Sequence, residues 1–339
     1  MRELRSLTFH IGMPKTATTA LQRHVFPAFP GYVGKGYGSV GQEPHSEHDF
    51  HVQARRRALG STEWREELAD WVEGLHDSGL TDVIFSDETL CAWSDGQLLS
   101  RWPMMDAFVA GSRRRPHPVV EFLGEAKELV GDATDVRAIL TVRNQSDLMG
   151  SLYAQVQPFL KEPGQVDFEG KISALLAGDD PFFDFGTLVE ELDAALGPAS
   201  CLVLLHEDGV EHNAHRIADF LGLPSDVLPR SIPAANVKAS GEGAWQYRDS
   251  LPLLKRGLVG RIRKAAELRV ARLGGQQRRL RKVLRRLDEL SLTVFPPRAV
   301  TGVEIALPEI LAGEIRAHFA QSNAHLAERL QRDLTALGY

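Results

Sequence analysis

The feature that most constrains the fold is an alternation of short apolar runs with stretches of helical periodicity. The runs are bounded by polar or turn residues and rich in β-branched and large apolar side chains, as is typical of strands buried on both faces. They are LTFHIG (7–12), DVIFSDE (82–88), VRAILTVR (136–143) and SCLVLLHED (200–208). Helical patterns separate them at 17–26, 62–77, 124–131 and 186–197. We therefore predict an α/β fold with a central parallel sheet of about four to five strands.

Composition excludes several classes of protein. The chain has 339 residues, enough for one large domain or two small ones. A formal net charge of −6 argues against a nucleic-acid-binding protein. Cys91 and Cys201 lie in or beside apolar runs, so we expect buried free thiols. We see no signal peptide and no run near the roughly 20 apolar residues of a membrane span, so we expect a cytoplasmic protein.

The last third of the chain has a different pattern. From Trp245 to Leu290 we see no strand, and two apolar stripes, at 254–268 and 280–290, flank Gly274-Gly275 and predict a helical hairpin. Residues 255–286 hold 13 lysines or arginines and one acid. We predict an α/β core at 1–240, a basic hairpin insertion at 241–295, and a C-terminal segment at 296–339 whose helix, 308–336, packs back on the core.

Three interpretations of the basic hairpin stay open. It could be a lid that supplies arginine to an anionic ligand. It could be a surface for peripheral contact with an anionic membrane or an acidic acceptor. It could also pack structurally on the core or on the second subunit of a homodimer.

The loop after the first run combines several features that bind anions. Gly12 to Thr19 lie where a strand gives way to a helix, and the unpaired N–H groups of a helix N-terminus favour an anion. Lys15 adds a positive charge, and hydroxyl groups follow it. A triphosphate-binding loop reads G-x-x-x-x-G-K-[ST], whereas Lys15 comes only three residues after Gly12. The loop predicts a site for a phosphate or a phosphosulfate.

The stretch HIGMPKTATTALQ (10–22) resembles the 5′-phosphosulfate loop of the sulfotransferase family, P-K-[ST]-G-T-T after the first strand. The matching positions are Pro14, Lys15, Thr16, Thr18 and Thr19. Ala17 stands where the family usually has glycine; it fits at a negative φ, whereas a positive φ would strain the loop. The resemblance implies a P-loop-like three-layer fold. It also implies the donor PAPS (3′-phosphoadenosine-5′-phosphosulfate), bound by residues 12–19, and no metal.

A second motif fits the same donor. Sulfotransferases bind the 3′-phosphate with an arginine that ends a strand and a serine eight residues later, and Arg143 and Ser151 match that spacing. A guanidinium forms a two-pronged pair with phosphate, which suits this role. Asp147, Tyr153 and Gln155 also fit bacterial members of the family, without a firm role.

Sulfuryl transfer to a hydroxyl requires a group that removes the hydroxyl proton. In carbohydrate-type sulfotransferases a glutamate after the second strand is the base, so the resemblance implies Glu88, with Asp87 as the alternative because the register is open. Glu88 could instead cap a helix beginning near Thr89. We expect His10 to be a packing or supporting residue. We expect Glu207 and Asp208 to cap the helix after the fourth run.

These motifs predict a bacterial PAPS-dependent sulfotransferase with Lys15 and Glu88 as catalytic residues. Its acceptor would be a small molecule or glycan: a hydroxyl of a sugar, a glycolipid or a secondary metabolite. The products would be the sulfated acceptor and adenosine 3′,5′-bisphosphate. One alternative is a P-loop kinase-like phosphotransferase, which would need magnesium. The other is a non-catalytic relative that binds a polyanion. The histidines at 45–51 could bind a metal, but we expect them in a loop near the acceptor.

Overall fold

The computed structural model describes residues 4–34, 37–38, 63–77, 79–88, 90–92, 116–156, 164–178, 181–229, 231–233, 240–241, 244–246 and 304–339. The predicted hairpin at 254–290 and the histidines at 45–51 lie outside the described residues. Two compact units are distinguished: a core unit (1–152, 170–238 and 308–339) and a second unit (153–169 and 239–307). The predicted boundaries between the core and the hairpin, at residues 240 and 241, and between the hairpin and the C-terminal segment, at residues 295 and 296, remain predictions.

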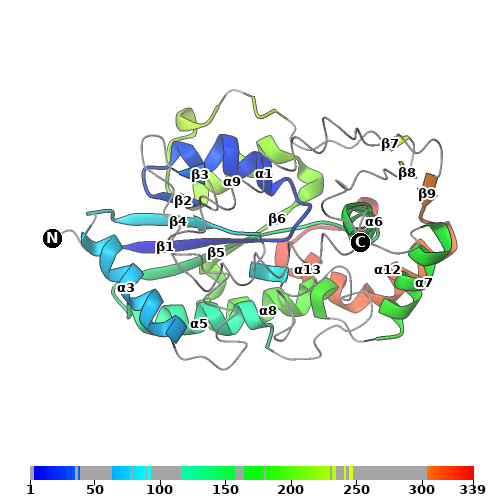
Figure 1. The fold of residues 1–339 in the computed structure, drawn as a ribbon, viewed down its shortest axis with the longest axis horizontal. Coiled ribbons are helices and arrows are strands. Elements are labelled where there is room, and N and C mark those ends of the chain that lie inside the picture. The colour runs from blue at the N-terminus through cyan, green and yellow to red at the C-terminus, as the bar shows by residue number, and fades with distance from the viewer. Residues whose placement is uncertain are drawn as a thin grey trace, which may run out of the picture. The chain divides into compact units, whose positions relative to one another are not determined.

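The core unit contains a sheet with the strand order β3-β2-β4-β1-β5-β6 (Figure 1). Its strands are β1 Ser6–Gly12, β2 Tyr32–Gly34, β3 Tyr37–Gly38, β4 Asp82–Ser86, β5 Asp135–Val142 and β6 Cys201–Leu205. The β2–β3 pair is antiparallel and all other pairs are parallel. The predicted α/β class and the parallel sheet are confirmed. Strand β2 was missed because three residues, the last of them a glycine, are too few to show a period.

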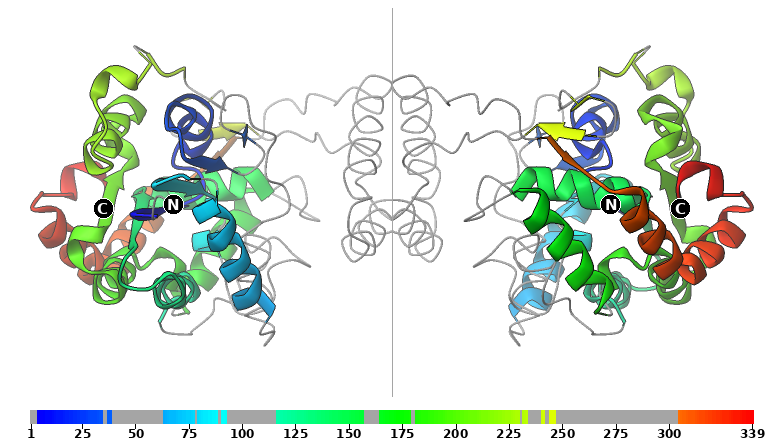
Figure 2. Two further views of the ribbon diagram at one scale, coloured as in Figure 1. Left: turned by 90° about the vertical axis from the view of Figure 1, so that its left-hand side faces the viewer. Right: turned by 90° about the vertical axis from the view of Figure 1, so that its right-hand side faces the viewer.

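Helices cover both faces of this sheet, which gives the three layers expected. Figure 1 shows α1 (Thr18–Ala20) and α9 (Val210–Phe220) on one face, and α3 (Glu63–Asp77), α5 (Pro118–Val130) and α8 (Phe185–Leu196) on the other; Figure 2 shows the same layers from the sides. The segment predicted as a helix at 17–26 continues from α1 as a π-helical turn at Leu21–Val25 and a 3₁₀ turn at Phe26–Ala28.

Alternate residues of each strand supply the two halves of the core. Toward α1 and α9, Ile84, Ile139 and Leu204 pack with residues such as Phe26 and Ile217. Toward α5, Phe9 packs edge-on against Phe85 and Phe122, at centroid distances of 6.1 and 5.8 Å. Cys91 and Cys201 are buried free thiols, as predicted. Burial of both strand faces explains why the strands read as continuous apolar runs.

The prediction of one helix over 308–336 was wrong. The segment forms α12 (Glu309–His318) and α13 (Ala320–Leu330), then a 3₁₀ turn at Thr335–Leu337. Phe319 separates the two helices and is buried, with its ring 6.3 Å from that of Phe183. Helix α13 packs on α8, where Arg329 forms two hydrogen bonds to the carboxylate of Asp193, at 2.5 and 3.2 Å. An apolar period cannot reveal such a break, because buried positions continue through it.

The second unit contains a small antiparallel sheet of β7 (Ser240–Gly241), β8 (Ala244–Gln246) and β9 (Glu304–Ala306). Trp245 therefore lies in a strand, paired with Ile305, so the prediction of no strand over 245–290 was wrong at residues 245 and 246; the rest of that range lies outside the described residues. A strand of three residues is too short to show alternation. In the same unit the Tyr153 hydroxyl donates to the Asp167 carboxylate (2.8 Å) and accepts from Gly164 N–H (3.0 Å). Two further helices are α6 (Gln145–Val156) and α7 (Gln165–Leu176).

The contact between α8 and α13 yields a stability prediction. The N–H of Gly186 donates to Ser322 Oγ (2.9 Å), and a Cβ at Gly186 would lie 2.2 Å from the Ser322 carbonyl oxygen. We expect Gly186→Ala to lower the free energy of unfolding by about 1–3 kcal/mol, as overpacking does. Gly124→Ala, in α5, is the control, because nothing lies within 4 Å of its Cβ position. It should stabilise the protein by about 0.5–1 kcal/mol. Urea unfolding measures both, and equal midpoints would contradict the close approach.

Candidate functional site

The loop after β1 lies directly against the turn after β4. Gly12 has φ 112°, and a Cβ there would lie 2.6 Å from the carbonyl oxygen of Glu88. The N–H of Asp87 donates to the carbonyl of His10 (3.0 Å), which joins the same two segments. Only glycine fits this contact, so the backbone of the predicted phosphate loop and the segment carrying the predicted base are in van der Waals contact.

The backbone of the loop is in an unusual conformation. Lys15 and Ala17 have φ of 69° and 62°, so Ala17 takes the left-handed conformation that the family's glycine would adopt freely. Thr16 is buried, and its hydroxyl donates to the carbonyl of Met13 (2.5 Å). Pro14 and Thr18 are also buried, and Thr19 is half-buried at the start of α1. The Thr16 hydroxyl therefore stabilises the loop itself.

Two cationic side chains and one carboxylate meet at this loop. Arg143 follows β5 and its guanidinium donates to the carbonyl of Lys15 (3.5 Å). Burial, and next the charge of Arg143, lower the pKa of Lys15, while the charge of Glu88 opposes them. Lys15 therefore lies within electrostatic range of both Arg143 and Glu88. Like charges held together repel, so an anion bound between Lys15 and Arg143 would be stabilised by both.

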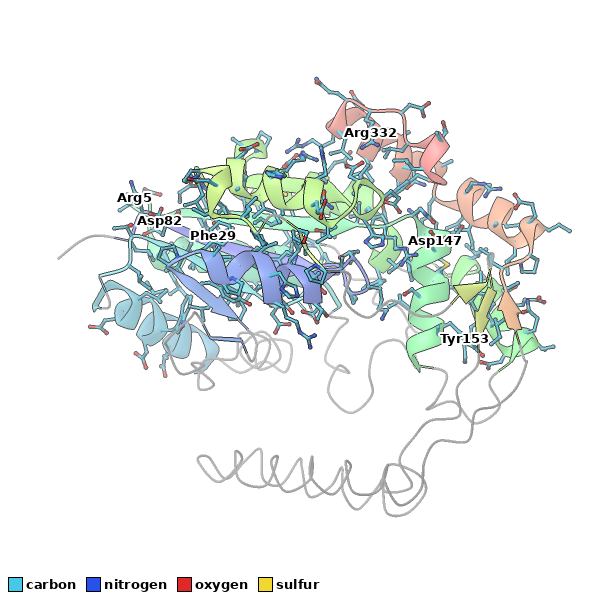
Figure 3. All side chains as sticks on the ribbon, turned by 90° about the horizontal axis from the view of Figure 1, so that it is seen from above. Arg5, Phe29, Asp82, Asp147, Tyr153 and Arg332 are labelled. Atoms are coloured by element: carbon cyan, nitrogen blue, oxygen red, sulfur yellow. The ribbon has the colours of Figure 1, made fainter. Side chains whose placement is uncertain are left out.

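Arg143 also contacts helix α6. Its guanidinium pairs with Asp147 at 3.4 Å, and within the described part of the chain its Nε is buried without a hydrogen-bond partner. Figure 3 shows Asp147 at the opposite end of the core unit from Arg5 and Asp82, where β1 and β4 begin. Arg143 therefore lies at the carboxyl ends of the strands, where ligands of open α/β sheets bind.

Ser151 lies on α6, half-buried. It is four residues beyond Asp147, so the two share one face of the helix. Among the described residues no hydrogen bond joins Ser151 to Arg143. The fold places Ser151 on the helix that leads away from Arg143, and its role toward a phosphate stays a prediction. Gln155 also lies on α6.

The two carboxylates after β4 have different surroundings. Asp87 is 0% exposed, whereas Glu88 is half-buried and its Oε2 accepts a hydrogen bond from Gln22 Nε2 (2.7 Å). The same nitrogen donates to Ser86 Oγ (3.1 Å), which lies 2.7 Å from Nδ1 of the fully buried His10. The sequence analysis missed Gln22. Gln22 could have been found from its spacing of four residues from Thr18, because that spacing puts both side chains on one side of the helical segment after the loop.

The prediction that Glu207 and Asp208 cap the next helix was wrong. Gly209, with φ 83°, occupies the N-cap of α9, and no side chain caps that helix. Instead Glu207 accepts from the N–H of Asn144 (2.9 Å) and from the Tyr339 hydroxyl (3.1 Å). Asp208 pairs with Arg332 at 2.6 Å. The carboxylates after β6 therefore hold the residue next to Arg143 and the C-terminal segment.

His206, the first residue after β6, also lies at this edge. Burial, and next the charge of Arg143, lower the pKa of His206, while the nearby carboxylates and a hydrogen bond to the backbone of Thr16 raise it. The end of β6 thus contacts both the phosphate loop and the surroundings of Arg143. Within the described residues, no group of three histidines, cysteines or carboxylates could hold a metal ion. No helix in the described residues is long and apolar enough to cross a membrane.

Comparison with known proteins gives few matches. No protein-family model and no curated protein matches the chain. The crystal structure of a sulfotransferase from Alicyclobacillus acidocaldarius is 13% identical over 99% of both chains, with a TM-score of 0.49. The sulfotransferase domain of the Synechococcus PCC 7002 olefin synthase is 12% identical over 69% of this chain and 80% of that one, with a TM-score of 0.34. At these TM-scores neither similarity supports an argument, so the function must be inferred from the chain's own residues.

The left-handed conformation of Ala17 predicts a stabilising substitution. Ala17→Gly removes the Cβ that crowds the backbone at φ 62°. It should raise the free energy of unfolding by about 0.5–1 kcal/mol. Ala20→Gly is the control, because Ala20 has φ −69° and is buried, and it should destabilise by about 1 kcal/mol or more. Urea unfolding of both variants gives the signs; the same sign for both would contradict the assigned conformation of Ala17.

The buried His10 predicts an acid-dependent loss of stability. Burial lowers the pKa of His10 from 6.5 to about 3, so between these values the unfolded chain binds a proton that the folded protein does not. The free energy of unfolding should fall by about 2 kcal/mol from this residue as the pH drops from 6.5 to 5. The His10→Asn variant should show a pH dependence shallower by that amount in urea unfolding. Parallel curves for the two proteins would show that His10 titrates normally.

Proposed function

We propose that the protein is a PAPS-dependent sulfotransferase that moves a sulfuryl group to the hydroxyl of an acceptor by in-line displacement. One observation carries the proposal: Lys15, Arg143 and Glu88, which follow three different strands, come together at the carboxyl end of the sheet. Two cations suit a donor with two phosphate groups, and the carboxylate beside them suits removal of a proton. The resemblance of residues 10–22 to the sulfotransferase loop supports the same donor.

The donor's two phosphates would be bound by different parts of the chain. The 5′-phosphosulfate would bind to residues 12–19, through backbone N–H groups and the hydroxyls of Thr18 and Thr19. The 3′-phosphate would bind to Arg143, with Ser151 as second donor. The buried, unpartnered Nε of Arg143 in the described structure supports an anion there, because a buried guanidinium N–H otherwise stays unsatisfied.

The chemistry would divide between the two remaining charged groups. Lys15 would stabilise the negative charge that develops on the phosphate oxygen as the sulfuryl group leaves. Glu88 would take the proton from the acceptor hydroxyl. Its partial exposure supports this role over Asp87, whose carboxylate is fully buried. A glutamate base suits an alcohol, so the acceptor class we propose is a sugar, a glycolipid or a secondary metabolite.

Nucleotide binding tests the donor. Adenosine 3′,5′-bisphosphate should bind more tightly than ATP or 5′-AMP without magnesium in titration calorimetry. Arg143→Ala should weaken bisphosphate binding about 10–100-fold, the value of a charged hydrogen bond, and leave 5′-AMP binding nearly unchanged. Arg316→Ala is the control, because Arg316 pairs with Glu309 on the exposed surface of α12. Tighter binding of ATP, dependent on magnesium, would favour the phosphotransferase instead.

Turnover tests the base. In an assay with labelled PAPS and extracts of alcohol acceptors, Glu88→Gln should lower the rate by about 10²–10⁴-fold. Binding of adenosine 3′,5′-bisphosphate should stay within about twofold of the wild type, because the amide preserves the shape of the side chain. Unchanged turnover would remove Glu88 from the reaction. Bisphosphate binding without any sulfated product from the wild type would favour the non-catalytic relative.

A further inference from the structure

The carboxamide of Gln22 links the candidate base to the interior of the core unit. Gln22 is 4% exposed and lies in the π-helical turn that follows α1. Its Nε2 donates to Glu88 Oε2 (2.7 Å) and to Ser86 Oγ (3.1 Å). An amide nitrogen has two hydrogens, so both are used, and both acceptors belong to the segment at the end of β4.

The hydroxyl of Ser86 also contacts the ring of His10. His10 Nδ1 lies 2.7 Å from Ser86 Oγ, and burial lowers the pKa of His10 to about 3, so its ring is neutral at physiological pH. Ser86 Oγ has two lone pairs and one proton, so in either neutral tautomer of His10 it can accept from Gln22. The opposite orientation of the Gln22 amide would place its carbonyl oxygen against a carboxylate oxygen. The network therefore holds the amide with its donors toward Glu88.

We propose that Gln22 is a positioning residue for Glu88, holding Oε2 so that Oε1 is presented to the acceptor hydroxyl. The inference rests on the proposed function, in which Glu88 is the base. Among the described residues, the Gln22 amide makes the hydrogen bond to this carboxylate. An amide N–H donates but does not take up a proton, so the network orients the base and does not conduct its proton away.

The position of Gln22 in the chain gives the network a second consequence. Gln22 comes four residues after Thr18, on the helical segment that begins at the phosphate loop. One short element thus contacts both the proposed site of the donor and the base that acts on the acceptor. The distance between donor and base is then set by that element, and misplacement by as little as about 1 Å can lower a rate 10²-fold.

The test uses Gln22→Met, which keeps the length of the side chain and removes its donors. We expect kcat in the labelled-PAPS assay to fall about 10–100-fold, as expected for a displaced catalytic group. The Kd for adenosine 3′,5′-bisphosphate should stay within about twofold, because the donor's own contacts are intact. The control is Asn323→Leu, which removes another buried amide, hydrogen-bonded to Gln145 (2.8 Å). It should leave kcat unchanged among molecules that are folded.

Two more variants test whether Gln22 acts through Glu88. Ser86→Ala removes one anchor of the amide, and its kcat should fall in the same direction by a smaller factor. It also keeps the test open if Gln22→Met does not fold. In the Glu88→Gln background, Gln22→Met should lower the residual rate by less than about twofold, because residues that act as a unit are not additive.

The outcomes separate this inference from the proposed function. A wild-type protein that binds no adenosine 3′,5′-bisphosphate and transfers no sulfuryl group would contradict the function itself. An active wild type with unchanged kcat in Gln22→Met would overturn the positioning role alone. A loss in Gln22→Met that is matched by Asn323→Leu, or that is fully additive with Glu88→Gln, would also overturn it, because it would reflect a general loosening of the core.

Discussion

The contact of Gly12 with the backbone of Glu88 is the constraint on which the candidate site depends. A side chain at Gly12 would collide with the carbonyl oxygen of Glu88, so the loop after β1 and the turn after β4 lie closer together than any other residue at position 12 would allow. The parallel pairing of β1 with β4 brings their carboxyl ends to one edge, and the glycine removes the last obstacle between them. Anion-binding and proton-accepting groups can then share one small volume.

Charged side chains of both signs are concentrated at that edge. The pairing of Arg143 with Asp147 offsets one cation, and Glu88 partly offsets Lys15. Burial nevertheless lowers the pKa of Lys15, which shows that the free protein keeps its ammonium group in surroundings that disfavour charge. Surroundings of this kind become more favourable for the two cations when an anion lies between them.

Local sequence was sufficient for some features and insufficient for others. The four long strands and the residues at their ends were predictable, because burial on both faces leaves unbroken apolar runs and topology brings strand ends together. The partners of Glu207 were not predictable, since Asn144 and Tyr339 are distant in sequence and an acid before a helix usually caps it. The only indication of a role for Gln22 was its spacing of four residues from Thr18. The sign of φ at Ala17 could not be predicted, because alanine does not favour the left-handed region and its presence gives no indication of that conformation.

The hydrogen bond between Tyr339 and Glu207 has a consequence for how the protein is made. Glu207 also holds the N–H of Asn144, the residue beside Arg143. Tyr339 is buried, so this arrangement is complete only when the chain has been synthesised through residue 339 and that segment has left the ribosome. The loop at residues 12–19, by contrast, is synthesised about 320 residues earlier. The two parts of the candidate site would therefore form at widely separated stages of translation, and the strand core has to persist without the contact of Tyr339 until then.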